Sequence, residues 1–295
     1  GHERGSPYNR PNQDGPAEGM GFRTNATGLD LNRDFVKLDA PESRALVRLV
    51  NAWRPHLVVD NHVTNGSDHA WVLTWAASEP PQVAAEVGAW LGPAMARTAA
   101  ATTAAGYPNG PYVDLVDELD PTRGFSSVVA GARLSTGYFP LRNRPVVLVE
   151  NHSLKPFRQR VEANRAFLEA LLAEVGRSGR ELVTAVAAAE RATLDRGRPD
   201  ASPSPLVLDW RPAPADRAVL PLREWWVAES PVTGRPLLHF RPDTLRPVEV
   251  PWQHRVEPGL TVPRPRGYLV LPGWPEVEER LAGHGLRVER LASPL

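Results

Sequence analysis

An asparagine and an arginine lie side by side in the segment Gly28–Phe35, whose sequence is GLDLNRDF. A guanidinium such as that of Arg33 can form two parallel hydrogen bonds with one carboxylate, and the amide of Asn32 can add a third. Turn residues precede the pair and a helix signal follows it, so we expect the pair in a surface loop. Such a loop suits a substrate with a free carboxylate, although a solvated loop with an ordinary Arg–Asp ion pair would explain the same residues.

Two short apolar runs each end in polar residues that could do chemistry. Residues 56–62 read HLVVDNH, and residues 144–152 read RPVVLVENH. Such β-branched runs are typical of strands that are buried on both faces of a sheet. In open α/β sheets, ligands bind in the crevice beyond the carboxyl ends of the strands. We therefore expect both polar ends to face a ligand crevice.

Three of these polar residues have a specific chemical interpretation. His62 can act as a neutral metal ligand, and Asp60 is close enough in sequence to orient its ring. Glu150, in a partly buried crevice, can have its pKa raised into the range of a general base. The alternatives are a solvated His62 at a strand end and a Glu150 that is held in a salt bridge by Arg144 or Arg158.

The remaining pattern predicts an α/β fold. Strand and helix signals alternate along the first two thirds of the chain, which indicates a mixed, mostly parallel sheet sandwiched by helices. The spacing predicts a helix over 41–54, and its apolar residues on one face are Leu46, Leu49, Val50 and Trp53. Further elements are expected as a strand at Trp71–Trp75 and as helices at 80–105, 157–176 and 178–195.

A change in composition near residue 196, from helical patterns to short apolar runs separated by proline and glycine, predicts a domain boundary. We expect a first domain at 1–196, a linker at 197–204 and a smaller β-rich domain of unknown role at 205–295. In the last part, strands are expected at 225–227, 237–240, 268–271 and 286–291, and a helix at 275–284. Its aromatic residues could form a sugar- or peptide-binding face but are expected mainly in the core; they are Trp210, Trp225, Trp226, Trp252 and Trp274.

The composition excludes several kinds of partner. The 295-residue chain has 34 basic and 34 acidic residues, so it has no overall charge that would favour nucleic acid or an anionic membrane surface. It has no cysteine, which excludes disulfides and thiolate metal sites and leaves the compartment open. No apolar run reaches the length of a membrane span. The chain starts GHER without an initiator methionine, so we interpret it as beginning inside a domain, with any targeting segment upstream.

Taken in order, these residues resemble a known family. A GLDLNRDF loop, a helix beginning Pro-Glu, a strand ending VVDNH and a later strand ending LVE follow one another within roughly residues 1–165. This order is similar to that of the zinc-dependent metallocarboxypeptidases, the carboxypeptidase A-like family. The resemblance implies a zinc metalloprotease that removes C-terminal residues from peptides. It also slightly favours an extracytoplasmic location, periplasmic or secreted.

The resemblance implies roles in the chemical step. His62 resembles the third zinc ligand of the family. Glu150 resembles the general base that activates the zinc-bound water, and Arg23 resembles the arginine that stabilises the oxyanion of the tetrahedral intermediate. In this family the zinc lowers the pKa of its water and polarises the scissile carbonyl.

The resemblance also implies residues that bind the substrate, a peptide or acyl-amino acid with a free carboxylate. Asn32 and Arg33 resemble the pair that grips this carboxylate. Tyr138 resembles the mobile tyrosine that caps the substrate, with Tyr112 as a weaker rival.

One part of the family pattern is missing. The first two zinc ligands of the family come from an H-x-x-E motif upstream of the Asn-Arg loop, where this sequence has none, and HExxH is absent too. Gly1 is expected to end the family's N-x-D-G turn, with Asn12–Gly15 as an alternative. Because one histidine cannot hold zinc by itself, we expect an N-terminally truncated chain that binds zinc weakly and is inactive, from a parent that is a metallopeptidase.

Two other functions fit parts of the sequence. A zinc acyl-amino-acid hydrolase of the aspartoacylase and succinylglutamate-desuccinylase type would share the sheet and a carboxylate-binding arginine. A non-catalytic binding protein or pseudoenzyme would explain the missing ligands and would use the domain or its C-terminal part for binding. The conjunction of Arg23, the Asn-Arg pair and Tyr138 favours the peptidase.

Overall fold

The structure is a computed structural model of the 295-residue chain, and it describes residues 21–64, 70–127, 130–198 and 200–292. Gly1 and residues Asn12–Gly15, the two candidates for the N-x-D-G turn expected from the sequence, lie outside these ranges. No described helix is long and apolar enough to cross a membrane.

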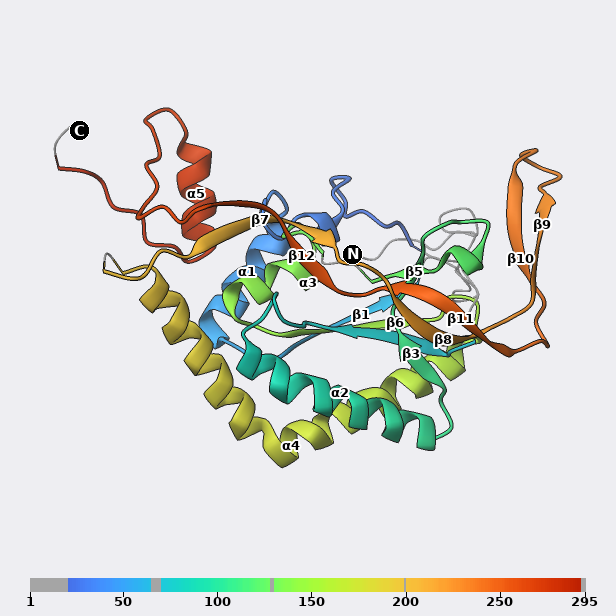
Figure 1. Cartoon of the computed structure of the whole chain (residues 1–295). Coiled ribbons are helices and arrows are strands. Elements are labelled where there is room, and N and C mark those ends of the chain that lie inside the picture. The colour runs from blue at the N-terminus through green and yellow to red at the C-terminus, as the bar shows by residue number, and fades with distance from the viewer. Residues whose placement is uncertain (1–20, 65–69, 128–129, 199, 293–295) are drawn as a thin grey trace.

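The first part of the chain is built on a mixed four-stranded sheet (Figure 1). The order is β1-β6-β2-β3, in which β1 pairs with β6 in parallel and β2 pairs with β6 in antiparallel fashion, while β2 and β3 are parallel. The strands are β1 (Val58–Val63), β2 (Leu73–Ala77), β3 (Asn109–Pro111) and β6 (Val146–Asn151). The predicted mixed α/β fold is confirmed, and helices lie on both sides of this sheet.

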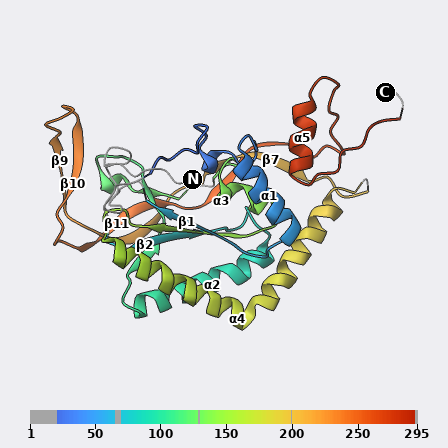
Figure 2. The same cartoon turned by 180° about the vertical axis from the view of Figure 1, so that it is seen from behind.

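Two long helices, α2 (Ala85–Ala104) and α4 (Phe157–Arg196), cover one face of the sheet (Figures 1 and 2). Strand residues with odd numbers, such as Leu73, Val147 and Val149, are fully buried in the core on this face. Each fully buried valine or leucine contributes about 1.5–3 kcal/mol. The alternation of strand side chains then leaves the even-numbered residues for the opposite face.

Helix α4 contains the break that the sequence predicts between residues 176 and 178. Ser178 has non-helical backbone angles, with φ −141° and ψ 20°. The indole Nε1 of Trp90 on α2 donates to both the carbonyl and the hydroxyl oxygen of Ser178, each at 3.0 Å. The kink is therefore held by a buried side chain that satisfies a backbone carbonyl freed from the helix ladder.

The opposite face carries helix α1 (Pro41–Trp53), the 3₁₀ turn η1 (Leu31–Arg33), the one-turn helix α3 (Ser135–Tyr138) and the 3₁₀ turn η3 (Pro140–Arg142). These elements enclose a second, smaller core whose buried members are Phe35, Leu38, Val47, Tyr138, Phe139 and Val146.

The apolar face that we predict for α1 is only partly right: Val50 packs against the small core, but Leu46, Leu49 and Trp53 are exposed. Ser43 and Val47 are its buried residues, whereas Leu46 is 42% and Trp53 is 80% exposed. The buried stripe is displaced by one residue because Val47 meets Phe35 and Val146 in the small core.

Strand β1 differs from the prediction in two ways. It continues through Asp60 and His62 to Val63, so the polar residues lie within the strand and do not follow it. It is half-buried rather than buried on both faces, because β1 is the edge strand of the described sheet and β6 is the inner one.

A second sheet joins the two halves of the chain. Its order is β4-β5-β11-β8, and it consists of β4 (Asp114–Leu115), β5 (Phe125–Ser126), β8 (Asp216–Leu222) and β11 (Arg246–Gln253). The link is parallel pairing of Trp252 with Phe125 and of Gln253 with Ser126. A 3₁₀ turn, η2 (Pro121–Arg123), precedes β5. The predicted boundary near 196–205 stays a prediction, although strands from both sides of it share this sheet.

The rest of the C-terminal part is β-rich, as predicted. Strands β7 (Pro205–Pro212) and β12 (Val256–Pro263) pair with each other, and so do β9 (Trp225–Glu229) and β10 (Pro236–Phe240). Helix α5 (Pro275–Gly283) confirms the predicted late helix. The strands predicted at 268–271 and 286–291 are wrong: these residues are irregular and mostly exposed, because no neighbouring strand pairs with them. Trp252 is half-buried, whereas Trp274 is 63% exposed.

Candidate functional site

The strand register aligns three polar side chains across the face of the sheet that is opposite to α2 and α4. His62 on β1 is the direct partner of Glu150 on β6, and Glu150 is the direct partner of Thr74 on β2. Side chains of direct partners lie on the same face of the sheet, and in the antiparallel pair of Glu150 and Thr74 the Cβ atoms are about 4.5–5.5 Å apart. The topology thus brings together His62 and Glu150, the two residues that the sequence predicts as a metal ligand and a general base.

His62 is oriented by a carboxylate from its own strand. Its Nε2 lies 2.9 Å from Oδ2 of Asp60, and the hydroxyl of Ser135 on α3 donates to the same oxygen. The hydrogen bond to Asp60 raises the pKa of His62, and the charges of Asp60 and Glu150 add to this effect against the cost of burial. Burial pushes the pKa of Asp60 upward, but the bonds and charge from His62 and the bond from Ser135 outweigh it and hold the pKa low.

Glu150 is buried, with 9% of its surface exposed, and burial raises its pKa from 4.5 to about 7. The charges of Asp60 and Asp114 act in the same direction, while those of His62 and Arg23 oppose it. Within the described residues, Glu150 Oε2 and Thr74 Oγ1 are buried and have no hydrogen-bond partner. A carboxylate with such a pKa can accept and release a proton near neutral pH.

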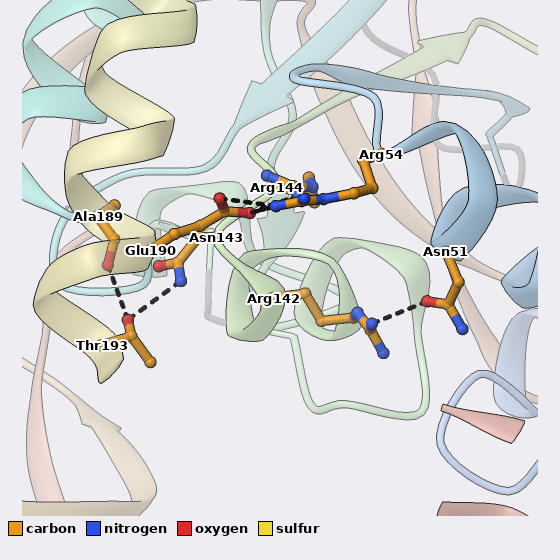
Figure 3. A network of polar contacts seen from close by, with 8 residues as sticks. All are labelled: Asn51, Arg54, Arg142, Asn143, Arg144, Ala189, Glu190 and Thr193. Carbon is orange, nitrogen blue, oxygen red and sulfur yellow. Dashed lines mark hydrogen bonds and ion pairs between the residues drawn. The ribbon is translucent and has the colours of Figure 1, made fainter. Parts of the chain in front are cut away.

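The salt bridges considered as alternatives for Glu150 are not formed. Arg144 pairs instead with Glu190 on α4, with Nη2 and Oε1 2.5 Å apart, and Arg54 shares this carboxylate (Figure 3). Arg158 pairs with Glu162 at 2.7 Å within one turn of α4.

Arg23 lies at the edge of the site. Its Nε is 2.7 Å from Oδ2 of Asp30, and its side chain is 50% exposed. Its charge has a minor effect on the pair and lowers the pKa values of both His62 and Glu150. A half-exposed arginine held in this way can meet a negative charge that develops beside Glu150.

The Asn-Arg pair lies in the turn η1, which Asp30 caps by accepting from the backbone N–H of Asn32 at 3.0 Å. The Asn32 side-chain oxygen accepts from the backbone N–H of Ser135 at 3.4 Å. Nη1 of Arg33 donates to the carbonyl of Asn32 at 2.8 Å, and within the described part of the chain Arg33 has no salt bridge. Its remaining donors are thus available to an anion.

A hollow of about 220 Å³ lies between η1, α1 and β1. Its lining is formed by Leu31, Asn32, Phe35, Glu42, Ser43, Leu46, Asp60 and His62. Asn32 and His62 therefore face a common space, whereas Arg33 does not line it. This volume is below the usual 300–1,000 Å³ of drug-sized sites, so it suits a small group such as one amino-acid side chain.

Tyr138 does not lie free at the site. It is 5% exposed and packs against Phe35 and Phe139, with ring centroids 5.7 and 5.3 Å away. Its hydroxyl lies 2.8 Å from Nδ1 of His284 and accepts from Nη1 of Arg142 at 3.0 Å. This packing does not suit a mobile side chain that caps a substrate.

Tyr112, the weaker rival, is electrostatically coupled to the site. Burial is the main cause of its raised pKa, and the negative charges of Asp114 and Glu150 raise this pKa further. Its hydroxyl lies 3.3 Å from Oδ1 of Asp114. Sequence reasoning missed Thr74 altogether; the only signal was one hydroxyl in the apolar strand LTWAA.

The described residues do not form a zinc site. In the ranges that the structure describes, no group of three His, Asp or Glu side chains could hold a metal. An H-x-x-E sequence does occur late in the chain, at His254–Glu257, but His254 binds Asp216 and Glu257 binds Arg211. Zinc sites need at least three protein ligands, so His62 does not fit the ion without ligands from elsewhere.

Comparison with known proteins finds no matching family model and no matching curated protein. Among solved structures, a metallo-carboxypeptidase from Burkholderia cenocepacia is similar with a TM-score of 0.42 and 18% identity, over 53% of this chain and 41% of that one. A protein from Shewanella denitrificans OS217 named "putative metallopeptidase" is similar with a TM-score of 0.33 and 17% identity, over 53% and 55%. The chain thus spans about half the length of these structures, and likenesses this distant do not establish a family.

Proposed function

We propose that this chain carries the general base and the carboxylate-binding site of a carboxypeptidase-like hydrolase. The observation that supports this most directly is the buried Glu150, with its pKa raised to about 7, directly beside His62 on the neighbouring strand. The substrate is a peptide or acyl-amino acid with a free carboxylate. Its carboxylate binds Asn32 and Arg33, and its side chain enters the hollow that Asn32 lines.

Charged residues at the site have different roles in the proposed reaction. Glu150 takes a proton from the attacking water and passes it to the leaving amine, for which a pKa near the working pH is best. Arg23 stabilises the negative charge that develops on the carbonyl oxygen. Asp60 and Ser135 hold the His62 ring in one orientation beside the base.

The metal of the resembled family would need ligands beyond the described residues. His62 offers one imidazole, and zinc would supply a polarised carbonyl and an acidic water if the other ligands were present. We propose that hydrolysis depends on such further ligands, and that the described residues by themselves bind the substrate without turning it over.

A comparison of two ligands tests the carboxylate site. N-acetyl-leucine has a free carboxylate, and N-acetyl-leucinamide is the same molecule without the charge. By calorimetry, the wild-type chain should bind the acid and not the amide. Arg33→Met should weaken binding of the acid about 10- to 100-fold, since hydrogen bonds to charged groups contribute about 1.5–3 kcal/mol.

The matched control is Arg48→Met, because Arg48 is an exposed residue of α1 that does not line the hollow. This variant should bind like the wild type. Equal affinity for the acid and the amide, or an Arg33→Met variant that binds as tightly as the wild type, would overturn the proposed carboxylate site.

A non-catalytic carboxylate-binding protein is the second candidate. The observation that favours it is the lack of a three-ligand metal group in the part of the chain that the structure describes. Stoichiometric zinc added to the full-length parent protein distinguishes the hydrolase from the binding protein. Hydrolysis of a free-acid peptide that is abolished by Glu150→Gln supports the hydrolase. Binding of the peptide without hydrolysis supports the non-catalytic binding protein.

A further inference from the structure

His284, directly after helix α5, connects two segments that are far apart in the sequence. Its Nε2 lies 3.0 Å from the carbonyl oxygen of Val36, and its Nδ1 lies 2.8 Å from the hydroxyl of Tyr138. A carbonyl can only accept, so in the neutral ring Nε2 carries the proton and Nδ1 accepts from the tyrosine. The tyrosine hydroxyl in turn accepts from Nη1 of Arg142. One imidazole thus completes a chain of directed hydrogen bonds.

The first segment is the turn that follows the Asn-Arg pair. The Asp34 carboxylate accepts from the backbone N–H groups of Asp39 and Ala40, both at 2.9 Å, which fixes the turn internally. Phe35 in this turn lines the hollow, and Val36 is the residue that His284 holds. A displacement of this turn would move the wall of the hollow and the neighbouring residues of η1.

The second segment is helix α3, which has four residues. At its start, Ser135 contacts two site residues: its backbone N–H donates to Asn32, and its hydroxyl donates to Asp60. At its end, Tyr138 is held by His284 and packs against Phe35. Such a short helix has little stability by itself, so its position depends on these contacts at both ends.

Helix α5 is docked firmly enough to place His284. Arg280 pairs with Asp39 at 3.1 Å, and the side chain of Asn51 on α1 donates to the carbonyl of Gly283 at 3.3 Å. Arg142 donates to the carbonyl of His284 at 2.7 Å and to Asn51 at 2.8 Å, and Figure 3 shows the latter contact. Figures 1 and 2 both show α5 above the end of α1, on the face of the sheet that carries the site.

The close packing extends to the backbone of the segment. A Cβ atom at Gly283 would lie 3.0 Å from Cδ1 of Leu38 in the same turn, and Gly285 has a positive φ of 75°. Both glycines allow the chain to approach the turn and to leave it again. The site therefore receives its support from the far C-terminal part of the chain.

We infer that His284 is a positioning residue for the substrate site, because it holds the turn at Val36 and helix α3 at Tyr138 in one fixed arrangement. In the proposed function, the C-terminal part of the chain thus holds Asn32 and the walls of the hollow in the geometry that binds a small carboxylate. The inference rests on that proposed function for its effect on binding, but the support of the two segments is a separate, measurable property.

The test uses the full chain with three variants. His284→Ala removes the bonds to Val36 and Tyr138. Tyr138→Phe keeps the ring and the bond between His284 and Val36, but it removes the bond to His284 and the acceptor of Arg142. His56→Ala alters an exposed histidine as the matched control. Two quantities are measured: the dissociation constant of N-acetyl-leucine by calorimetry, and amide hydrogen exchange in 34–38 and 135–139, with α4 as the internal reference.

His284→Ala should weaken binding about three- to tenfold, the effect of one ordinary hydrogen bond, and should accelerate exchange in both segments but not in α4. Tyr138→Phe should change both quantities less in the same direction, and His56→Ala should change neither. If His284→Ala does not fold, Tyr138→Phe decides by the same two measurements.

Two results would overturn the inference. In one, exchange becomes faster only within 275–285 while binding is unchanged, which would make α5 a packed but passive helix. In the other, exchange in 34–38 and 135–139 stays as in the wild type. If instead the wild type fails to bind N-acetyl-leucine, the proposed function fails, and the exchange data still decide whether His284 supports the two segments.

Discussion

At the scale of single residues, the burial of Glu150 sets its chemistry and has a cost. The side chain lies between His62 and Thr74 on the face of the sheet opposite the long helices, and its pKa is raised from 4.5 to about 7. A change of this size corresponds to roughly 3 kcal/mol between the two protonation states. A purely structural carboxylate would gain stability from a partner such as Arg144, so the cost fits a residue kept for function.

This cost predicts a pH dependence of stability. Because the pKa of Glu150 is raised in the folded state, its contribution is fully present below pH about 4.5 and is lost as the pH rises through about 7. Glu150→Gln cannot ionise, so the free energy of unfolding of the wild type should fall relative to this variant by roughly 3 kcal/mol between pH 4 and pH 8. Urea denaturation at a series of pH values measures the difference.

The control is Glu118→Gln, which alters an exposed carboxylate. Its difference from the wild type should not follow the same pH curve. A difference between the wild type and Glu150→Gln that stays constant over this range, or that changes in the opposite direction, would show that Glu150 is not destabilised by burial.

Residue types in the sequence were enough to find His62 and Glu150 but not their surroundings. Both are polar residues at the end of apolar, β-branched runs, a pattern that is typical of strand ends at a ligand crevice. Tyr138 has no such local signal of burial. Its hydroxyl is bound by His284, which lies 146 residues later in the chain, and no local pattern records a contact of that range.

At the scale of elements, helix positions were predictable and helix phases were not. The spacing of apolar residues located α1, α2 and both halves of α4 within a few residues. It did not reveal that α1 would bury Ser43 and Val47 and leave Leu46 at the hollow. The reason is that α1 contacts a small core and a ligand-sized space, so its apolar residues serve two neighbours.

The kink in α4 gives a prediction about the contact between the long helices. Trp90→Phe keeps most of the ring but removes both hydrogen bonds to Ser178, and the freed carbonyl would be left without its donor. This should lower the free energy of unfolding by about 1–2 kcal/mol, as measured by urea denaturation. Trp53→Phe, at a side chain that is 80% exposed, should have no measurable effect. Equal stability of the two variants would mean that the bonds to Ser178 do not hold the kink.

At the scale of the whole molecule, the two parts of the chain are connected through a sheet and a core. The pairing of β5 with β11 brings Phe125 and Trp71 into one buried cluster with Leu220 and Val250. The change of composition near residue 196 predicts a boundary at the linker, but it carries no information on this pairing. Contacts between distant strands depend on register and shape, which a linear pattern does not contain.

The shared core predicts that the two parts unfold together. Val250 is fully buried in β11, so Val250→Ala should lower the free energy of unfolding by roughly 1–3 kcal/mol. Because Val250 shares this buried cluster with Trp71 and Phe125 of the first part, its loss should make unfolding of both parts more frequent. Hydrogen exchange should then become faster in β6 as well as in β8, with one cooperative transition in urea. Val232→Ala, at a side chain that is 90% exposed, is the control and should leave both strands protected as in the wild type. Faster exchange confined to residues after 205, or two separate transitions, would show that the C-terminal part is an independent domain and that its pairing with β5 adds little to stability.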